Sequence, residues 1–393
     1  MTSKTTPSGE AVATWLAHAG PSPRDYHGFV NPPVVHASTV IFDNLEAYQT
    51  RSQRYVYGLM ATPTTDALTD TVTELEGAAG TVLTGSGLEA VTVALMSCVS
   101  AGDHLLVVDN VYGPTRRFCD KTLSRFGVEV SYFDSGVGSA IVDQFRPNTR
   151  AVFLEAPGSL TFEMQDIPAI VEAARPRGIL VAIDNTWATP LYYRPLDHGV
   201  DLSIQAATKY FGGHSDLLLG TVAANEAALP MLQETRQNLG VNAAPDDVFM
   251  TLRGMRTLPL RLARHYESGL TVARWLVSRP EVKRVLHPAL ESDPGHAIWK
   301  RDFTGACGLF ALILQPGSQA QLSAFVDGLS YFGLGASWGG FESLVTCPDP
   351  RSMRTATPWA EDGALVRLHI GLEEPADLIA DLEEGLKRWK AAG

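Results

Sequence analysis

The sequence predicts an α/β protein, in which a large domain built on a mostly parallel β-sheet with helices on both faces precedes a smaller α+β domain. Two observations support this class. Short apolar runs alternate with helical patterns between residues 61 and 255, and this alternation stops after residue 256. The length of 393 residues also exceeds what one ordinary hydrophobic core serves, so two domains are expected.

In the alternating region, each apolar run is short enough for a buried strand, and the intervening segments follow a helical period. One helix is predicted to open at Pro63 and to stop near Gly77. The other predicted helices cover residues 88–99, 112–126 and 166–177, and the predicted strands cover residues 81–83, 104–108, 128–133, 151–154 and 179–183. Asp109, Glu155 and Asp184 follow or end three of these strands, where parallel sheets bind ligands.

Two further regions flank the large domain, which is predicted to span residues 61–255. Residues 1–60 have weak periodicity, and Pro32-Pro33 is incompatible with regular helix, so we expect an extended arm that contacts a neighbouring subunit. Residues 256–393 form the predicted small domain. It is expected to contain helices over 260–278 and 319–329, strands over 308–314 and 364–369, and a last helix with an apolar stripe of Leu378, Leu382, Leu386 and Trp389.

Composition argues against several classes of function. A net charge of −12 without a run of Lys or Arg is unfavourable for nucleic-acid binding. No stretch approaches the roughly 20 apolar residues of a membrane span, and residues 1–10 lack the apolar segment of a secretory signal. The four cysteines form no CxxC pair, which favours the reduced cytoplasm, and we predict no metal site.

The first motif that could carry chemistry is Thr84-Gly85-Ser86-Gly87-Leu88-Glu89-Ala90, where glycines follow a predicted strand and open a helix. The amide groups at a helix N-terminus form an anion site. The segment also matches GxGxxA, with Asp109 about 20 residues further on, which is the spacing of a dinucleotide fingerprint. A phosphate cup for pyridoxal phosphate (PLP), an NAD site and a plain tight turn all remain open for this motif.

Two more motifs make the first alternative more specific. Asp184 ends an apolar strand, and a buried carboxylate needs a partner such as a protonated pyridine nitrogen. Lys209 lies among small and apolar residues, and desolvation would lower its pKa and make it a nucleophile. A phosphate cup, a pyridinium partner and a reactive lysine together match the needs of PLP, whereas a dinucleotide site explains only the first.

The sequence resembles the Cys/Met-metabolism family of PLP enzymes over nearly its whole length. The segment 201–216, with its core Ala207-Thr208-Lys209-Tyr210-Phe211-Gly212-Gly213-His214-Ser215-Asp216, is similar to the lysine signature of that family. Glu155-Ala156-Pro157-Gly158-Ser159 and the segment 337–343, which begins Ser337-Trp338-Gly339-Gly340, resemble its cystathionine β-lyase branch. Relatives active at the γ-carbon usually carry ESPTN at the first of these segments and lack the Trp of the second.

The resemblance implies the fold and the function. We expect fold type I with a seven-stranded sheet, PLP as the cofactor and a homotetramer built from dimers. The expected reaction is β-cleavage of L-cystathionine, or of a related S-substituted cysteine, to a thiol such as homocysteine, pyruvate and ammonia. The alternative within the family is γ-elimination or γ-replacement. An NAD oxidoreductase leaves Lys209 unexplained, and a non-catalytic protein would not need Lys209, Asp184 and Arg367.

The resemblance also implies the site residues. Lys209 would hold the cofactor as a Schiff base and move protons, Asp184 would bind its pyridine nitrogen, and Tyr112 would stack on its ring. Tyr57 would reach into the site of a neighbouring subunit. Gly87, Leu88 and Thr208 would hold the phosphate, and Arg367, Ser337 and Trp338 would bind the substrate. One departure is Leu59, which stands where the family has a phosphate-binding Arg, so Arg51 or Arg54 would substitute or the phosphate would be held less tightly.

Overall fold

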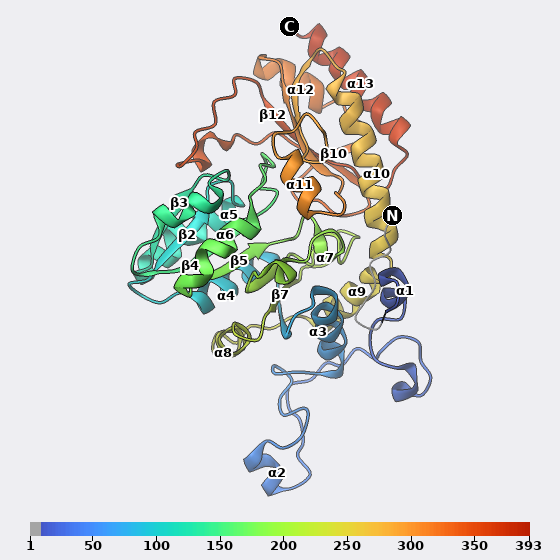
Figure 1. The fold of residues 1–393 in the computed structure, drawn as a ribbon. Helices are drawn as coiled ribbons and strands as arrows, with labels where there is room; N and C mark the ends of the chain where they lie inside the picture. Colours follow the sequence, from blue (N-terminus) through green and yellow to red (C-terminus); the bar gives the residue numbers. More distant parts are fainter. Residues whose placement is uncertain (1–8) are drawn as a thin grey trace.

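A computed structural model describes residues 9–393 and confirms the predicted class, with one large and one small β-sheet (Figure 1). The large sheet has seven strands in the order β1-β7-β6-β5-β4-β2-β3. Its strands are β1 (Gly80–Thr84), β2 (His104–Val108), β3 (Glu129–Phe133), β4 (Thr149–Glu155), β5 (Leu180–Asp184), β6 (Leu202–Gln205) and β7 (Gly220–Ala224). Strands β3, β2, β4, β5 and β6 run parallel, and only β7 is antiparallel to its neighbours β6 and β1.

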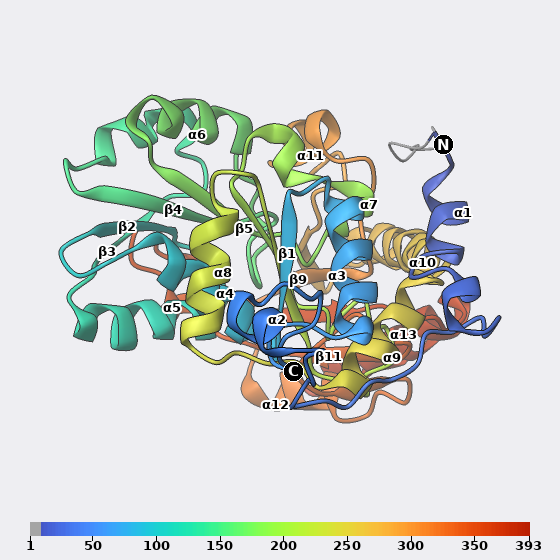
Figure 2. The ribbon, with the colours of Figure 1, turned by 90° about the horizontal axis from the view of Figure 1, so that it is seen from below.

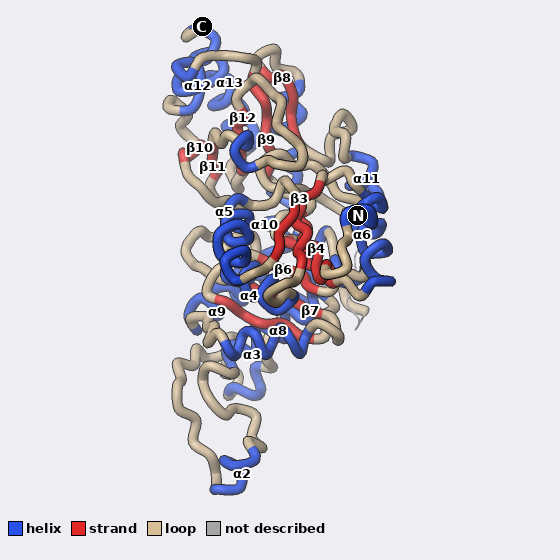
Figure 3. The backbone as a smooth tube through the Cα atoms, turned by 90° about the vertical axis from the view of Figure 1, so that its left-hand side faces the viewer, coloured by secondary structure: helices blue, strands red, loops and turns tan. Residues whose placement is uncertain are grey.

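Helices cover both faces of this sheet, with α4 and α5 on one side and α6 on the other (Figure 3). The helices of this part are α3 (Pro63–Glu76), α4 (Gly87–Cys98), α5 (Gly113–Phe118), α6 (Ile167–Ala174), α7 (Thr189–Tyr192), α8 (Leu229–Asn238) and α9 (Pro245–Met255). Helix α3 begins with a capping box at Thr62 and ends at Gly77, whose φ of +67° is a conformation that glycine adopts easily. Strand β2 is buried at every position, which explains its continuous apolar run.

The small sheet has five strands in the order β10-β11-β12-β9-β8. They are β8 (Val282–Leu286), β9 (Leu309–Leu314), β10 (Phe332–Leu334), β11 (Ser343–Thr346) and β12 (Leu365–His369). Its helices are α10 (Leu258–Val277), α11 (His296–Asp302), α12 (Gln319–Val326) and α13 (Pro375–Ala391). In α13 the expected apolar stripe is buried at Leu378, Leu382 and Leu386 against the second hydrophobic core.

Two local expectations were wrong. Residues 112–126 do not form one regular helix, because α5 passes into a π-helical turn at Cys119–Leu123 and a 3₁₀ turn at Ser124–Phe126. The arm contains α1 (Val12–Ala17), a 3₁₀ turn at Pro23–Tyr26 and α2 (Leu45–Thr50), although no helix was predicted there. Helix α1 lies next to α10 (Figure 2), and after it the arm leads away from both sheets, with α2 at its far end (Figure 1).

Several large apolar side chains of the arm are exposed, namely Phe29, Val30, Ile41, Leu45 and Tyr48. Exposed apolar side chains gathered on one projecting segment are typical of an interaction surface. Within residues 9–393, no helix is both long and apolar enough to cross a membrane, and no group of His, Cys, Asp and Glu side chains is arranged to hold a metal ion.

Candidate functional site

A cavity of about 300 Å³ lies at the carboxyl ends of the parallel strands, where the strand-end rule places a ligand. Its wall combines the start of α4, the ends of β4 and β5, the segment after β6, and residues from the small sheet. Of the ten site residues predicted from the sequence, nine line this cavity: Gly87, Leu88, Tyr112, Asp184, Thr208, Lys209, Ser337, Trp338 and Arg367. Segments that are far apart in the sequence therefore meet at one site.

Lys209 lies in the connection between β6 and β7, and its amine points toward the small domain. The Nζ atom donates a hydrogen bond of 2.6 Å to Ser337 Oγ and lies 5.4 Å from the centre of the Trp338 ring. Burial, helped by the positive charge of Arg367, lowers the pKa of Lys209 to about 8, although Asp184 acts in the opposite direction. A lysine with this pKa is neutral for about a tenth of the time at pH 7, a few hundred times more often than an ordinary lysine, so it is a far more available nucleophile.

Asp184 occupies the end of β5, and its carboxylate is fixed from one side. Thr186 donates to Asp184 Oδ1 through its amide at 3.0 Å and through its hydroxyl at 2.5 Å. Burial raises the pKa of Asp184, while the bonds from Thr186 and the charge of Lys209 favour the ionised form. A cationic group placed in the cavity beside Asp184 would supply the pairing that a buried carboxylate requires.

Glu155 also lines the cavity, although it was not among the predicted site residues. It is the register partner of Asp184 on the neighbouring strand. Burial first, and then the charge of Asp184, raise the pKa of Glu155 well above its ordinary value. Glu155 Oε2 accepts a 2.7 Å hydrogen bond from the amide of Tyr112, so it fixes the backbone from which the Tyr112 ring projects.

The N-terminus of α4 faces the cavity. Ser86 caps this helix by accepting from the Glu89 amide, so Gly87 and Leu88 are its first two residues. The amides in the first turn of a helix have no acceptor within the helix and are available to an anion. A Cβ on Gly87 would lie 2.4 Å from the Cβ of Ala206, so only glycine allows this close approach. Thr208 lies nearby, with its hydroxyl donating to Leu219 O at 3.1 Å.

The small domain contributes Arg367 from β12 and the loop that contains Ser337 and Trp338. Arg367 Nη2 donates to the carbonyl oxygen of Ser337 at 3.1 Å. Ser337 has φ of +89°, which is unfavourable for a residue with a side chain, so surrounding contacts must hold this loop. One such contact is the 3.1 Å hydrogen bond that the Gly339 amide donates to Nε2 of the buried His369.

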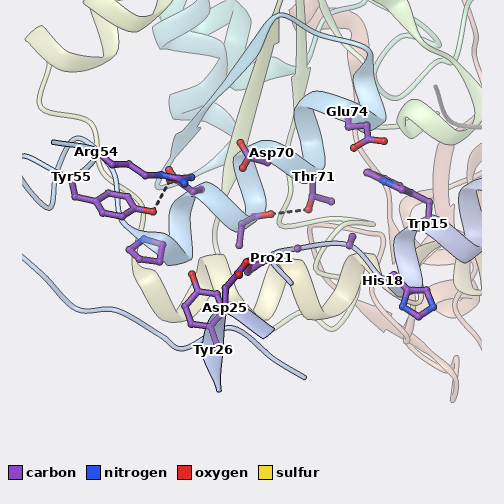
Figure 4. A pocket seen from close by; sticks show the side chains of 15 residues that line it. Trp15, His18, Pro21, Asp25, Tyr26, Arg54, Tyr55, Asp70, Thr71 and Glu74 are labelled. Carbon is purple, nitrogen blue, oxygen red and sulfur yellow. Dashed lines mark hydrogen bonds and ion pairs between the residues drawn. The ribbon is translucent and has the colours of Figure 1, made fainter. Parts of the chain in front are cut away.

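Tyr57 is the predicted site residue that does not line this cavity. It lies in the arm and is 47% exposed. The carbonyl oxygen of the nearby Leu59 accepts a 2.7 Å hydrogen bond from Arg236 Nη2. Arg54 pairs with Asp66 at 2.9 Å in a second cavity of about 350 Å³ between the arm and α3 (Figure 4). Arg54 is thus held by an acidic side chain within its own chain.

The main cavity fits a phosphorylated aromatic aldehyde of the size of PLP. The start of α4 offers amides to a phosphate, and the cradle formed by Gly87 and Ala206 has no space for a larger residue. Asp184 offers a buried carboxylate to a protonated ring nitrogen, and Lys209 offers an amine of lowered pKa to an aldehyde. Tyr112, which is 45% exposed beside this cavity, offers an aromatic face.

Comparisons with known proteins indicate the same cofactor. A family model for Cys/Met metabolism PLP-dependent enzymes matches residues 13–387. A Rhizobium johnstonii protein assigned as a cystathionine beta-lyase is 56% identical over 378 residues, which are 95% of this chain and 95% of that protein. Cystathionine beta-lyase MetC of Escherichia coli is 44% identical over 387 residues, covering 95% of this chain and 98% of MetC. The crystal structure of cystathionine gamma synthase from Xanthomonas oryzae pv. oryzae, in complex with aminoacrylate and cysteine, is 35% identical, with a TM-score of 0.89 over 97% of this chain and 99% of that one.

Proposed function

The chain belongs to the Cys/Met metabolism family of PLP-dependent enzymes, and we propose that it is a carbon–sulfur lyase that cleaves L-cystathionine at its β-carbon. PLP is its cofactor. The relatives named as β-lyases are 56% and 44% identical to it, whereas the γ-synthase of known structure is 35% identical. The observation that carries the proposal is the meeting of Lys209, Asp184 and Arg367 around one cavity in a chain of this family.

The reaction breaks the bond between Cβ and sulfur. Homocysteine leaves as a thiol, and the remaining three-carbon fragment is 2-aminoacrylate, which water converts to pyruvate and ammonia. When bound, PLP supplies an electron sink for the negative charge that develops at Cα of the substrate. Asp184 would hold a negative charge against the ring nitrogen, and its buried position keeps that charge free of competing water.

Lys209 is proposed as the residue that holds PLP and as the base that moves the proton. Its lowered pKa allows the neutral amine to take the proton from Cα and then to give it to the departing sulfur. The bond from Nζ to Ser337 Oγ would keep the amine oriented when it is not attached to the cofactor. Tyr112 would stack on the ring, and its hydroxyl would be a second proton donor to the departing sulfur besides Lys209.

The remaining site residues are assigned to binding. Arg367 would pair with the α-carboxylate of the substrate, for which its planar fork is well shaped. Ser337 and Trp338 would line the substrate side of the cavity, because Arg367 binds the carbonyl oxygen of Ser337 and Trp338 follows in the same loop. Gly87, Leu88 and Thr208 would hold the phosphate of PLP. For Thr208 this requires its hydroxyl to release Leu219 O.

The quaternary assembly is part of the proposal. We infer that residues 1–60, of which 1–8 lie outside the described residues, form an arm that packs on a neighbouring subunit, with Tyr57 contributing to the site of that subunit in a homotetramer. The exposed apolar side chains of the arm support this, because association would bury them. We assign PLP binding to residues 61–255 and the small domain to residues 256–393. A cytoplasmic location is supported by four cysteines that are all unpaired.

The proposal is tested by incubating the purified yellow protein with L-cystathionine and identifying the keto acid. Pyruvate is expected, and 2-oxobutyrate would assign the protein to the γ-cleaving branch instead. Borohydride reduction followed by peptide mapping should place a pyridoxyl group on Lys209. Lys209→Ala should lose the cofactor absorbance and nearly all turnover, so retained turnover would contradict the role of this residue.

A further inference from the structure

Asp109 was singled out in the sequence as a strand-end carboxylate, but the proposed reaction gives it no task. It immediately precedes the segment that leads to Tyr112, and its side chain is fully buried. Instead of facing the cavity, Asp109 binds residues from the small domain that follow it by almost 250 positions in the sequence. Burying a carboxylate costs free energy, so its use in a contact between distant segments suggests that this contact has a role.

The partner of Asp109 is the strap, defined here as residues 353–359. It belongs to the connection between β11 and β12, so it leaves the small sheet and returns to it. Figure 1 shows this orange-red connection reaching from the small domain toward β3. Two residues after the strap, Glu361 pairs with Lys283 at 2.9 Å and with Arg284 at 3.1 Å on β8, which fixes the return of the chain to the small domain.

The side chain of Asp109 binds the backbone amides at the centre of the strap. The amides of Thr355, Ala356 and Thr357 donate to the Asp109 carboxylate at 2.9 to 3.2 Å, and Arg116 pairs with the same carboxylate. Burial alone would raise the pKa of Asp109, but the three amides and Arg116 outweigh it and hold the pKa below its ordinary value. The carboxylate is thus ionised and fully engaged at neutral pH.

A second contact ties the strap to residues 161 and 163, in a segment that contributes to the cavity wall. Arg354, whose side chain is only 4% exposed, forms an ion pair with Glu163 and donates to Thr161 Oγ1 at 2.8 Å. Leu160 and Phe162, which flank Thr161 and line the cavity, have φ values of +66° and +58°. Such values are costly for residues with side chains and persist only where neighbouring contacts enforce them.

The two anchored segments also bind each other. Ser159 donates its amide to the carbonyl oxygen of Asn110 at 2.8 Å, and Asn110 Nδ2 donates to Glu163 Oε2 at 3.1 Å. A Cβ on Gly158 would lie 1.9 Å from Asn110 Nδ2, so these segments are in direct contact. Residues 109–112 and 157–163 therefore form one rim of the cavity, which the strap contacts at both ends.

We propose that the strap fixes this rim from the small domain, with Asp109 and Arg354 as positioning residues for the β-lyase reaction, an inference that rests on the proposed function. Asp109 sets the backbone that carries the Tyr112 ring. Arg354 stabilises the strained segment 160–163, from which Leu160 and Phe162 line the cavity. Neither side chain lines the cavity, so each acts through residues that do.

The test compares the holoenzyme with Asp109→Asn and Arg354→Ala, using Arg351→Ala as a matched control. Arg351 is an exposed arginine just before the strap, paired only with Asp349 and the Glu361 carbonyl oxygen among the described residues. Hydrogen exchange measured by mass spectrometry on peptides that span 354–359 reports directly on the three amides bound by Asp109. Exchange there should rise about tenfold or more in Asp109→Asn, because an amide replaces the charged acceptor.

Kinetics separate positioning from a purely structural role. With saturating PLP, Asp109→Asn and Arg354→Ala should retain the cofactor absorbance, because Lys209 and Asp184 are untouched. Their kcat/KM for L-cystathionine should fall about ten- to a hundredfold, as expected when reacting groups are displaced slightly. The Arg351→Ala protein should match the wild type. Because Arg354→Ala keeps Asp109, it tests the idea even where Asp109→Asn folds poorly.

Two results would overturn the inference. One is unchanged exchange of the strap amides in Asp109→Asn; the other is faster exchange in that variant with kcat/KM equal to that of Arg351→Ala. Failure of the proposed function is distinguishable from both, since it would appear as wild-type protein that releases no pyruvate from L-cystathionine. The exchange measurement on the strap does not depend on the identity of the substrate.

Discussion

Replacing Glu76 by glutamine should change how the stability of the protein depends on pH. Glu76 is the last residue of α3, and its side chain is fully buried beneath β6. Its Oε1 accepts from Ser203 Oγ and from Gln205 Nε2, both at 3.1 Å, whereas Oε2 has no partner within the described part of the chain. Burial raises the pKa of Glu76 from 4.5 to about 7, although these two bonds act in the opposite direction.

The sign and size follow from proton linkage. Between pH 4.5 and about 7 the native state keeps a proton on Glu76 that the unfolded chain has released. The free energy of unfolding therefore falls as pH rises through this window, by about 3 kcal/mol in total, and levels off above it. A glutamine side chain cannot ionise, so the stability of Glu76→Gln relative to wild type should improve by about 3 kcal/mol between about pH 4 and about pH 8.

Urea unfolding followed by tryptophan fluorescence at several pH values measures this difference. Glu74→Gln is the matched control, because Glu74 lies on the exposed side of the same helix. Its difference from wild type should stay nearly constant with pH. A Glu76→Gln protein whose stability relative to wild type is the same at both ends of this pH range would show that the pKa of Glu76 is the same in the folded and unfolded chain, so that burial does not raise it.

Three further predictions concern the cavity. Asp184→Asn removes the charge opposite the ring nitrogen and should lower kcat about 10²- to 10³-fold while PLP still binds, as steady-state kinetics with absorbance spectra would show; an unchanged kcat would remove Asp184 from the mechanism. Arg367→Lys loses a planar fork and should raise KM for L-cystathionine about ten- to a hundredfold with a smaller change in kcat, and an unaffected KM would place the substrate carboxylate elsewhere. The rate at which apoprotein takes up PLP should rise with pH with a midpoint near pH 8 and level off above it, because only the neutral amine of Lys209 reacts. In stopped-flow absorbance, Arg367→Leu should move this midpoint upward, since the charge of Arg367 helps to lower the pKa of Lys209, and an unmoved midpoint would contradict that electrostatic account.

Much of the fold was predictable because its central strands are buried on both faces. Strand β2 is apolar at every position after His104, and α3 carries a proline start and a glycine stop, so both were located within a residue or two. Strands such as β10 and β11 span only three or four residues, too few to show a period. The turn at Cys119–Leu123 was also not predictable, because a π-helical turn keeps nearly the same apolar pattern as an α-helix.

The site was predictable where chemistry is local. Lys209 and Asp184 were identified from their apolar surroundings and strand-end position, and the structure places both at one cavity. Glu155 carried the same strand-end signal, which could have added it to the predicted site residues. The partners of Asp109 could not be inferred, because its ligands are backbone amides of Thr355, Ala356 and Thr357, and backbone amides carry no sequence signal.

The reversed direction of β7 has a consequence for redesign. Because β7 runs back along β6, with Gln205 opposite Thr221, the connection that carries Lys209 starts and finishes at the same edge of the sheet. Residues added between 212 and 217, which do not line the cavity, would lengthen a closed hairpin without altering the strand register on either side. Such insertions offer a way to change the segment that links Lys209 to β7 while the reactive amine, the cofactor cradle and the scaffold stay in place.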